Sequence, residues 1–140
     1  MNATRTSTLI TTASAIVLGA GGIALLFASD VLLPHVLPGM AAGATVLGQL
    51  VSAGWLAVAW LNWNQRRIVV GGIYGRPTVL ANLGLYLVSA FSLAHAAKAN
   101  GAPPVLGGLA LLFGAFALLY GMLLLRGPFG ADAAAPVRGS

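Results

Sequence analysis

The sequence contains no cysteine and only two acidic residues, Asp30 and Asp132. The absence of cysteine excludes disulfides, thiolate metal ligands and cysteine nucleophiles. Only 6% of the 140 residues are charged, whereas a soluble domain carries about 25%. A chain with so few charges cannot cover itself with a water-facing surface, and 59% of its residues are hydrophobic. The composition therefore predicts a small protein whose main partner is the lipid bilayer.

The formal net charge is +5, and a basic balance can indicate a nucleic-acid-binding protein. Here the basic residues are few and stand at the ends of apolar runs. They do not gather on one amphipathic face or among aromatic residues. The pattern therefore predicts no nucleic-acid partner and is typical of membrane orientation instead.

Four apolar segments are long enough to cross a bilayer, which takes about 20 mainly apolar residues. They run from about residues 8–28, 40–63, 78–97 and 105–125, and none contains Lys, Arg, Asp or Glu. The first segment lacks a good small-x-small cleavage site, so we expect an uncleaved helix rather than a signal peptide. The sequence predicts an all-α integral membrane four-helix bundle of two antiparallel hairpins.

We expect residues 1–126 to form this single transmembrane domain and residues 127–140 to form a mobile cytoplasmic tail, because the tail is small, polar and rich in Ala, Gly and Pro. Six of the seven basic residues fall at one end of the predicted helices, and only Lys98 falls at the other. Basic residues favour the cytoplasmic side of a membrane. The distribution predicts cytoplasmic termini, and we expect the membrane to be a bacterial plasma membrane.

The connection between the second and third segments carries a group of basic residues. Arg66, Arg67 and Arg76 bracket the apolar run IVVGGIYG at residues 68–75, which overlaps the stretch GGIYGRP at residues 71–77. This stretch lacks the Lys-Ser/Thr of a phosphate-binding P-loop, and we assign it no role. The three guanidinium groups are candidates for binding anionic lipid, because juxtamembrane basic groups are attracted to it. The alternative is that they only set the orientation of the protein.

Two predicted helices carry stripes of small residues. In lipid, small side chains let helix backbones approach closely. We therefore expect each stripe to face a neighbouring helix, with Phe113 and Phe116 off the stripe and some of the large side chains toward lipid. We favour packing of the two stripes against each other within one chain; the alternative is that the fourth helix packs against a second subunit. The packing candidates are Gly19 and Gly22 in the first helix and Gly107, Gly114 and Gly121 in the fourth.

The second and third helices each carry a polar face, with Gln49 and Ser52 on one and Asn82, Tyr86 and Ser89 on the other. Polar groups within lipid need hydrogen-bond partners, so we expect both faces to point into the bundle. There they either bond the helices to one another, which we favour, or line a cavity for a small apolar ligand.

Asp30, His35 and His95 all fall at the predicted outer end. Two imidazoles and a carboxylate can bind a divalent metal with an open position. However, the spacing forms no local motif, and solvated helix ends are the simpler interpretation. A haem within the bundle would need histidines deeper in the helices, so the sequence predicts no cofactor.

No acidic residue lies within a predicted helix, which argues against a cation-coupled transporter. No serine stands in a nucleophile-elbow motif, so a triad enzyme is not predicted. We therefore expect a non-enzymatic membrane protein of structural or interaction type. It would be an accessory subunit of a larger membrane complex or a self-assembling homo-oligomer. The alternative is a protein that binds lipid or a small apolar ligand through the interface of the second and third helices and the arginine loop.

Overall fold

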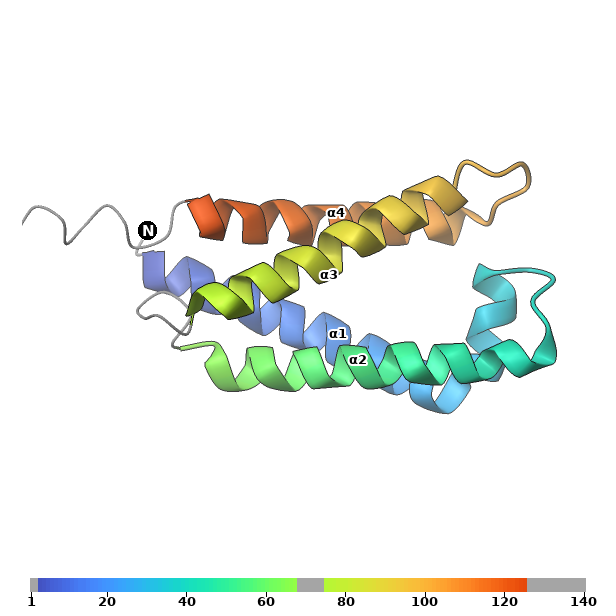
Figure 1. The fold of residues 1–140 in the computed structure, drawn as a ribbon, viewed down its shortest axis with the longest axis horizontal. Coiled ribbons are helices and arrows are strands. Elements are labelled where there is room, and N and C mark those ends of the chain that lie inside the picture. The colour runs from blue at the N-terminus through green and yellow to red at the C-terminus, as the bar shows by residue number, and fades with distance from the viewer. Residues whose placement is uncertain (1–2, 68–74, 126–140) are drawn as a thin grey trace, which may run out of the picture.

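A computed structural model describes residues 3–67 and 75–125 of the chain, and all regular structure in these residues is helical. Four long helices are each apolar enough to cross a membrane, which confirms the predicted all-helical fold and its four segments. The described residues do not include 71–74 of the GGIYGRP stretch or the predicted tail. The helices are α1 (Ala3–Val36), α2 (Thr45–Gln65), α3 (Gly75–Ala96) and α4 (Pro104–Leu125), with a short 3-10 turn η1 (Ala42–Ala44) before α2 (Figure 1).

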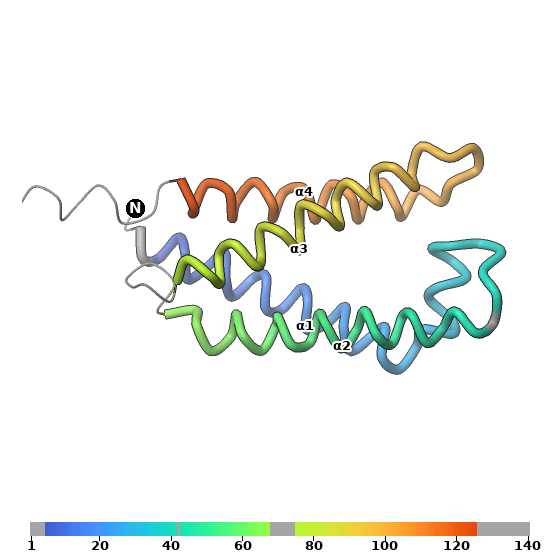
Figure 2. The backbone as a smooth tube through the Cα atoms, viewed as in Figure 1, coloured from blue at the N-terminus to red at the C-terminus, as the bar shows by residue number. Residues whose placement is uncertain are grey.

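Helix α1 is longer than the apolar run from which it was predicted. It has 34 residues, which at 1.5 Å per residue is about 50 Å against a hydrocarbon core of about 30 Å. The helix bends at Ala28, whose backbone angles are not helical (φ −132°, ψ 28°). The last two turns of α1 then run in a new direction before the chain enters α2 (Figure 2).

The four helices associate as two pairs, in which α1 lies along α2 and α3 lies along α4. Contact between the pairs is much less extensive. In Figure 1 the pairs approach each other where α1 begins and α2 ends, and they diverge toward the connections at residues 37–44 and 97–103. The junction between the pairs is therefore concentrated at one end of the molecule.

Glycines bring α1 and α2 together. A Cβ placed on Gly22 would lie 2.8 Å from Leu56 Cγ and 3.3 Å from the Ser52 carbonyl oxygen, so no larger residue fits there without movement. A Cβ on Gly19 would lie 3.8 Å from Ala59 Cβ. These two glycines do stand at a helix contact, but the neighbouring helix is α2 rather than α4.

The expected packing of the glycine stripe of α4 against α1 is wrong. Among the described residues, no atom comes within 4 Å of a Cβ placed on Gly107 or Gly114, and a Cβ on Gly121 meets only Leu83 Cδ1 at 3.9 Å. The buried face of α4 instead carries Phe113 and Phe116, which are 2% and 6% exposed. Large rings fill the space between the helix pairs, and this packing needs no close approach of backbones.

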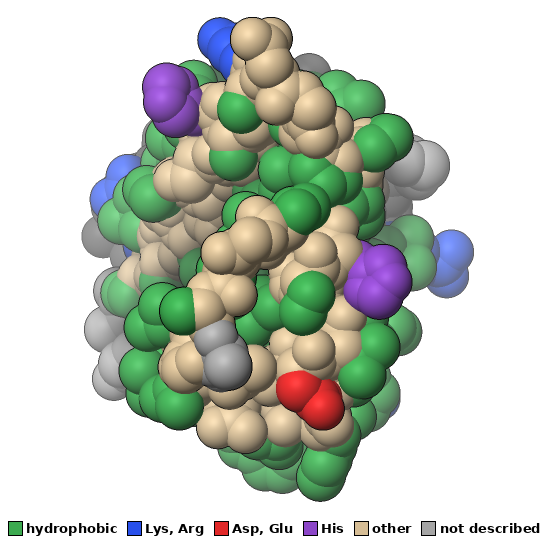
Figure 3. All heavy atoms as spheres, turned by 90° about the vertical axis from the view of Figure 1, so that its right-hand side faces the viewer, with side chains coloured by type: hydrophobic (Ala, Val, Ile, Leu, Met, Phe, Trp, Pro, Cys, Tyr) green, Lys and Arg blue, Asp and Glu red, His purple; other side chains and the backbone are tan. Residues whose placement is uncertain are grey.

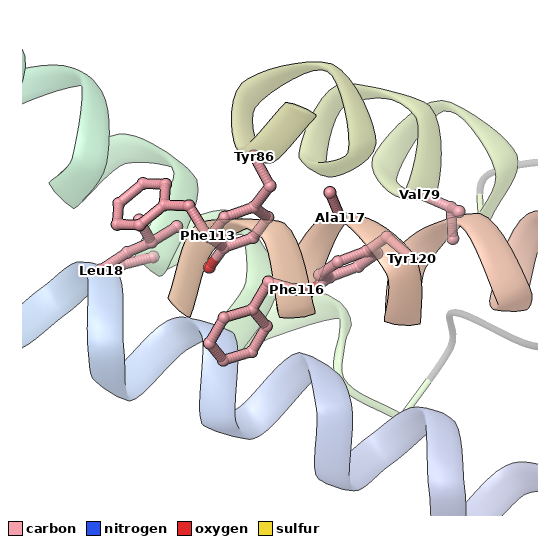
Figure 4. Close-up of a cluster of buried hydrophobic side chains, with 8 residues drawn as sticks. Leu18, Val79, Tyr86, Phe113, Phe116, Ala117 and Tyr120 are labelled. Atoms are coloured by element: carbon pink, nitrogen blue, oxygen red, sulfur yellow. The ribbon is translucent and has the colours of Figure 1, made fainter. Parts of the chain in front are cut away.

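An aromatic cluster forms the core of the junction (Figure 4). The ring of Tyr86 on α3 stacks on Phe116 with centroids 4.8 Å apart and on Tyr120 with centroids 5.8 Å apart. The ring of Phe113 meets Tyr86 edge-on at 5.3 Å. Leu18 of α1 belongs to the same buried cluster. Such aromatic pairs contribute about 0.5–1.5 kcal/mol each beyond their buried area, so they join α3 to α4 while packing against α1.

Candidate functional site

A cluster of polar side chains lies buried where the two helix pairs meet. Ser14 comes from α1, Asn62 from α2, and Asn82 and Tyr86 from α3, and all four are 0% exposed. The two amides bond reciprocally: Asn62 Nδ2 donates to Asn82 Oδ1 and Asn82 Nδ2 donates to Asn62 Oδ1, each at 2.7 Å. This amide pair joins α2 directly to α3, and therefore one helix pair to the other.

Ser14 completes the cluster from the side of α1. Its Oγ accepts a hydrogen bond from Asn62 Nδ2 at 2.9 Å and shares another with the Tyr86 hydroxyl at 2.6 Å. Asn82 Nδ2 also donates to the Thr78 carbonyl oxygen at 2.9 Å. An amide nitrogen has two hydrogens to donate, so both amides have every donor engaged. The cluster is internally satisfied, as groups buried away from water need to be.

Further polar groups continue from this cluster toward the end of the bundle where α2 stops and α3 starts. Thr78 Oγ1 donates to Gln65 Oε1, which joins α3 to the last turn of α2. Tyr120 of α4 is fully buried, and its hydroxyl lies beside those of Thr11 and Ser14. That hydroxyl reaches hydrogen-bond geometry with no group in the described part of the chain. The polar side chains thus form a track along the junction, with Tyr120 at its edge.

The five residues predicted to face into the bundle do not form one site. Asn82 and Tyr86 come together in the cluster, whereas Gln49 is exposed and Ser89 is half-buried. Ser52 is fully buried beside Gly22, and its hydroxyl has no partner among residues 3–67 and 75–125. The interface of α2 with α3 is therefore polar only near one end.

Ser14 and Asn62 are the members of the cluster that sequence reasoning missed. A signal for the first was present, because Ser7, Thr11 and Ser14 recur at helical spacing and all three prove to be buried. This polar stripe lies beside the small-residue stripe on which the prediction for the first helix rested. Asn62 lies in the last turn of α2, but spacing alone does not pair it with Asn82.

The candidate metal site at the other end is not assembled. Among the described residues, no three His, Cys, Asp or Glu side chains lie close enough to hold a metal ion, so the grouping of Asp30, His35 and His95 is wrong. Figure 3 views the molecule from this end and shows the two histidine side chains apart from each other. His35 Nδ1 is hydrogen-bonded to the Val31 carbonyl oxygen of its own helix at 2.7 Å. The histidines belong to different helix pairs, which diverge here.

The predicted arginine group lies at the end where the helix pairs meet. Arg66 is half-buried, with its guanidinium carbon 4.0 Å from the centroid of the Trp63 ring and Nη1 donating to the Trp63 carbonyl oxygen. Arg67 and Arg76 are exposed. One follows α2 and the other stands in the first turn of α3, and the loop between them, residues 68–74, lies outside the described residues.

Comparison with family models, with curated proteins and with solved structures finds no match to this chain. The class that the fold defines is a protein of four helices, each long and apolar enough to span a membrane. The buried cluster contains hydroxyl and amide groups but no carboxylate, imidazole or thiol. Its arrangement can bond helices together.

Proposed function

We propose that this chain is an integral membrane protein whose four helices cross the bilayer as two antiparallel hairpins, with both termini on the cytoplasmic side of a bacterial plasma membrane. The apolar length of each helix supports the crossing. The basic residues support the orientation, because Arg66, Arg67 and Arg76 stand at the cytoplasmic end in this arrangement and only Lys98 stands at the other.

The orientation is testable with single cysteines, because the natural chain has none. Lys98→Cys and Arg67→Cys are expressed separately and treated, in intact cells, with a maleimide that does not cross membranes. We expect labelling of Lys98→Cys in intact cells and of Arg67→Cys only after the membrane is opened. The reverse pattern would refute the orientation.

Within this membrane arrangement, we propose that the protein is of interaction type and assembles with a second copy of itself through α4. The observation that carries the proposal is an alternation of glycine and leucine along one exposed side of the helix. The leucines are 78%, 72% and 84% exposed. A Cβ placed on either of the first two glycines would have no atom of residues 3–67 or 75–125 within 4 Å. In order, the residues of this glycine–leucine face are Gly107, Leu111, Gly114, Leu118, Gly121 and Leu125.

The spacing of this face suits a helix–helix contact. Its steps of four and three residues repeat every seven, which is the period of left-handed helix pairs with knobs-into-holes packing. Each leucine of one copy can fill the space above a glycine of the other, so the same face serves both partners, as a twofold interface requires. Glycine costs about 1 kcal/mol relative to alanine inside a helix. Close approach of a second backbone in lipid would offset that cost.

Disulfide crosslinking in native membranes tests the assembly. Leu111→Cys places a thiol on the glycine–leucine face, and Ile16→Cys is the matched control because Ile16 is also exposed, at 59%, but lies on α1. We expect oxidation to give a covalent dimer of Leu111→Cys and little dimer of Ile16→Cys. Adding Gly114→Leu to Leu111→Cys should abolish the dimer, because the new side chain fills the space that the partner's leucine would occupy.

Three outcomes would contradict self-assembly through α4. Equal dimer yields for the two cysteine variants would mean that the crosslinks report random collisions. A dimer of Leu111→Cys that survives Gly114→Leu would mean that the copies meet on another face. A crosslink from Leu111→Cys to a different membrane protein, without a dimer, would show that the partner of α4 is a subunit of a larger complex and not a second copy of this chain.

The alternative of a small apolar ligand between α2 and α3 has less support from the geometry. Of the five polar residues expected to line that site, Asn82 and Tyr86 are hydrogen-bonded within the buried cluster. A ligand would have to displace those bonds and leave buried groups without partners, which costs about 1–3 kcal/mol for each group. The lipid-binding part of the alternative rests on the arginine group, which is independent of this cluster.

A further inference from the structure

The charged side chains of the described residues are segregated between the two ends of the bundle. Arg5, Arg66, Arg67 and Arg76 lie where α1 and α3 begin and α2 ends, which is one end of the molecule (Figure 1). Asp30, the only acidic residue in the described part of the chain, is near the other end, as is Lys98. No acidic residue occupies the first turn of α1 or α3. The end with the arginines therefore has a strongly positive potential.

Arg66 is already held in one conformation at this end. Its guanidinium lies over the Trp63 ring at 4.0 Å from the centroid, and one nitrogen donates to the Trp63 carbonyl oxygen. A guanidinium has five N–H donors, so most of them stay available to an anion. Because the side chain is already ordered, it loses less conformational entropy on binding than a free arginine does.

The start of α3 adds to the positive potential. The first amides of a helix carry N–H groups without partners in the helix and the positive end of the helix dipole, which together favour anions. Arg76 stands in this first turn, so its charge adds to that of the dipole. The hydrogen bond between Thr78 and Gln65 holds this turn beside the last turn of α2, which ends next to Arg66 and Arg67.

The same end also presents apolar rings. Trp60 and Trp63 are 71% and 45% exposed on the last turns of α2. Tryptophan favours the interface between the hydrocarbon core and the headgroups. An anion at the arginines would therefore lie at headgroup level, with aromatic and aliphatic surface directly on the hydrocarbon side of it.

We propose that Arg66, Arg67 and Arg76 bind the phosphate of an anionic phospholipid whose acyl chains lie along the tryptophan-bearing side of α2. Guanidinium groups match phosphate oxygens with paired hydrogen bonds, which an ammonium group cannot reproduce. The acyl chains distinguish this ligand from a free phosphate ion, because only a lipid uses the exposed tryptophans. The site is separate from the glycine–leucine face of α4, so either proposal can fail while the other holds.

Native mass spectrometry of the detergent-purified protein, with phosphatidylglycerol or phosphatidylcholine added, tests the proposal without depending on orientation in a membrane. Three variants are compared with the natural chain: Arg66, Arg67 and Arg76 together replaced by Gln, the same three replaced by Lys, and Lys98→Gln as the control at the other end. We expect the natural chain and Lys98→Gln to retain phosphatidylglycerol in preference to phosphatidylcholine.

The Gln variant should bind phosphatidylglycerol roughly 100-fold more weakly, because each of the three lost basic groups weakens binding to anionic lipid by about fivefold. The Lys variant should lose at least half of the retained lipid, because it keeps the charge but loses the paired hydrogen bonds. Unchanged retention by the Gln variant would exclude the site. Full retention by the Lys variant would show an unspecific attraction and overturn the proposal.

A competition experiment distinguishes a site for lipid from a site for a free phosphate ion. Inorganic phosphate is added in tenfold excess over phosphatidylglycerol, and the bound lipid should remain. Displacement of the lipid by inorganic phosphate would identify a site for free phosphate and overturn the assignment to a lipid.

Discussion

Replacing Asn82 by alanine tests whether the buried polar cluster joins the two helix pairs. The change removes both bonds of the reciprocal amide pair with Asn62, each 2.7 Å long, and the bond to the Thr78 carbonyl oxygen within α3. Asn62 then keeps only its bond to Ser14. An amide that is buried and half satisfied destabilises the folded state more than the lost bonds alone would.

The magnitude follows from the number of bonds between helices. Hydrogen bonds between membrane helices average about 0.6 kcal/mol in double-mutant cycles and reach about 1.7 kcal/mol. Two reciprocal bonds therefore predict a coupling of about 1–2 kcal/mol between Asn62→Ala and Asn82→Ala. Each single variant should lose about 2–3 kcal/mol of unfolding free energy, because the unsatisfied partner adds about 1 kcal/mol or more. The double variant should lose less than the sum.

The assay is unfolding in mixed micelles with increasing dodecyl sulfate, followed by circular dichroism. Asn64→Ala is the matched control, because Asn64 is exposed and its side chain bonds only to the Trp60 carbonyl oxygen of its own helix. Combined with Asn82→Ala, it should give effects that add within about 0.5 kcal/mol. If the Asn62 and Asn82 effects also add within that margin, the amide pair contributes no coupling and the reasoning is refuted.

Two further contrasts test the packing, each by thermal unfolding in detergent. Gly22→Ala should destabilise the fold by about 1–2 kcal/mol, because its Cβ would meet a leucine of α2 at 2.8 Å and overpacking outweighs the better helix propensity of alanine. Gly84→Ala on α3, the same change in open space, should be neutral or stabilise by up to about 1 kcal/mol. Similar losses for both would show that α3 is packed as tightly at Gly84 as α1 is at Gly22. Tyr86→Phe should cost about 1 kcal/mol, because it removes a 2.6 Å hydrogen bond. Tyr120→Phe should stay within about 0.5 kcal/mol, because no described group bonds to its hydroxyl, and a larger loss would reveal a bound water or another partner.

The number of long helices followed from the sequence because a run of apolar residues is a local property. The C-terminal end of α1 could not be predicted in the same way. The prediction stopped near residue 28, before Asp30, whereas the helix bends at Ala28 and continues through Pro34 to Val36. Asp30 and His35 are exposed on this last segment, so neither polar group has to be buried. A single charge marks the end of an apolar run without ending the helix.

Which side of each helix faces inward was harder to predict, for a reason specific to membranes. In water, burial separates apolar from polar residues, but lipid is as apolar as a protein core, so leucine or phenylalanine can face either way. Spacing places Gly107 and Gly114 on one stripe of the helix, but spacing does not identify the neighbour of that stripe. The interior face of α4 belongs to Phe113 and Phe116, which the small-residue argument had placed off the packing stripe.

For a helix in lipid, only the polar residues allow the inward-facing side to be predicted, because each polar group needs a hydrogen-bond partner within the protein. That argument placed Asn82 and Tyr86 inward, and both are buried. It did not identify Ser14 and Asn62, because the choice of partner depends on how the helices are rotated about their axes. The hydrogen-bonded pairs determine these rotations. Once Asn62 bonds to Asn82, and Ser14 to Tyr86, the inward-facing sides of α1, α2 and α3 are fixed. The aromatic rings of α4 then close the junction on its inner side, and the glycine–leucine face is left pointing away from it.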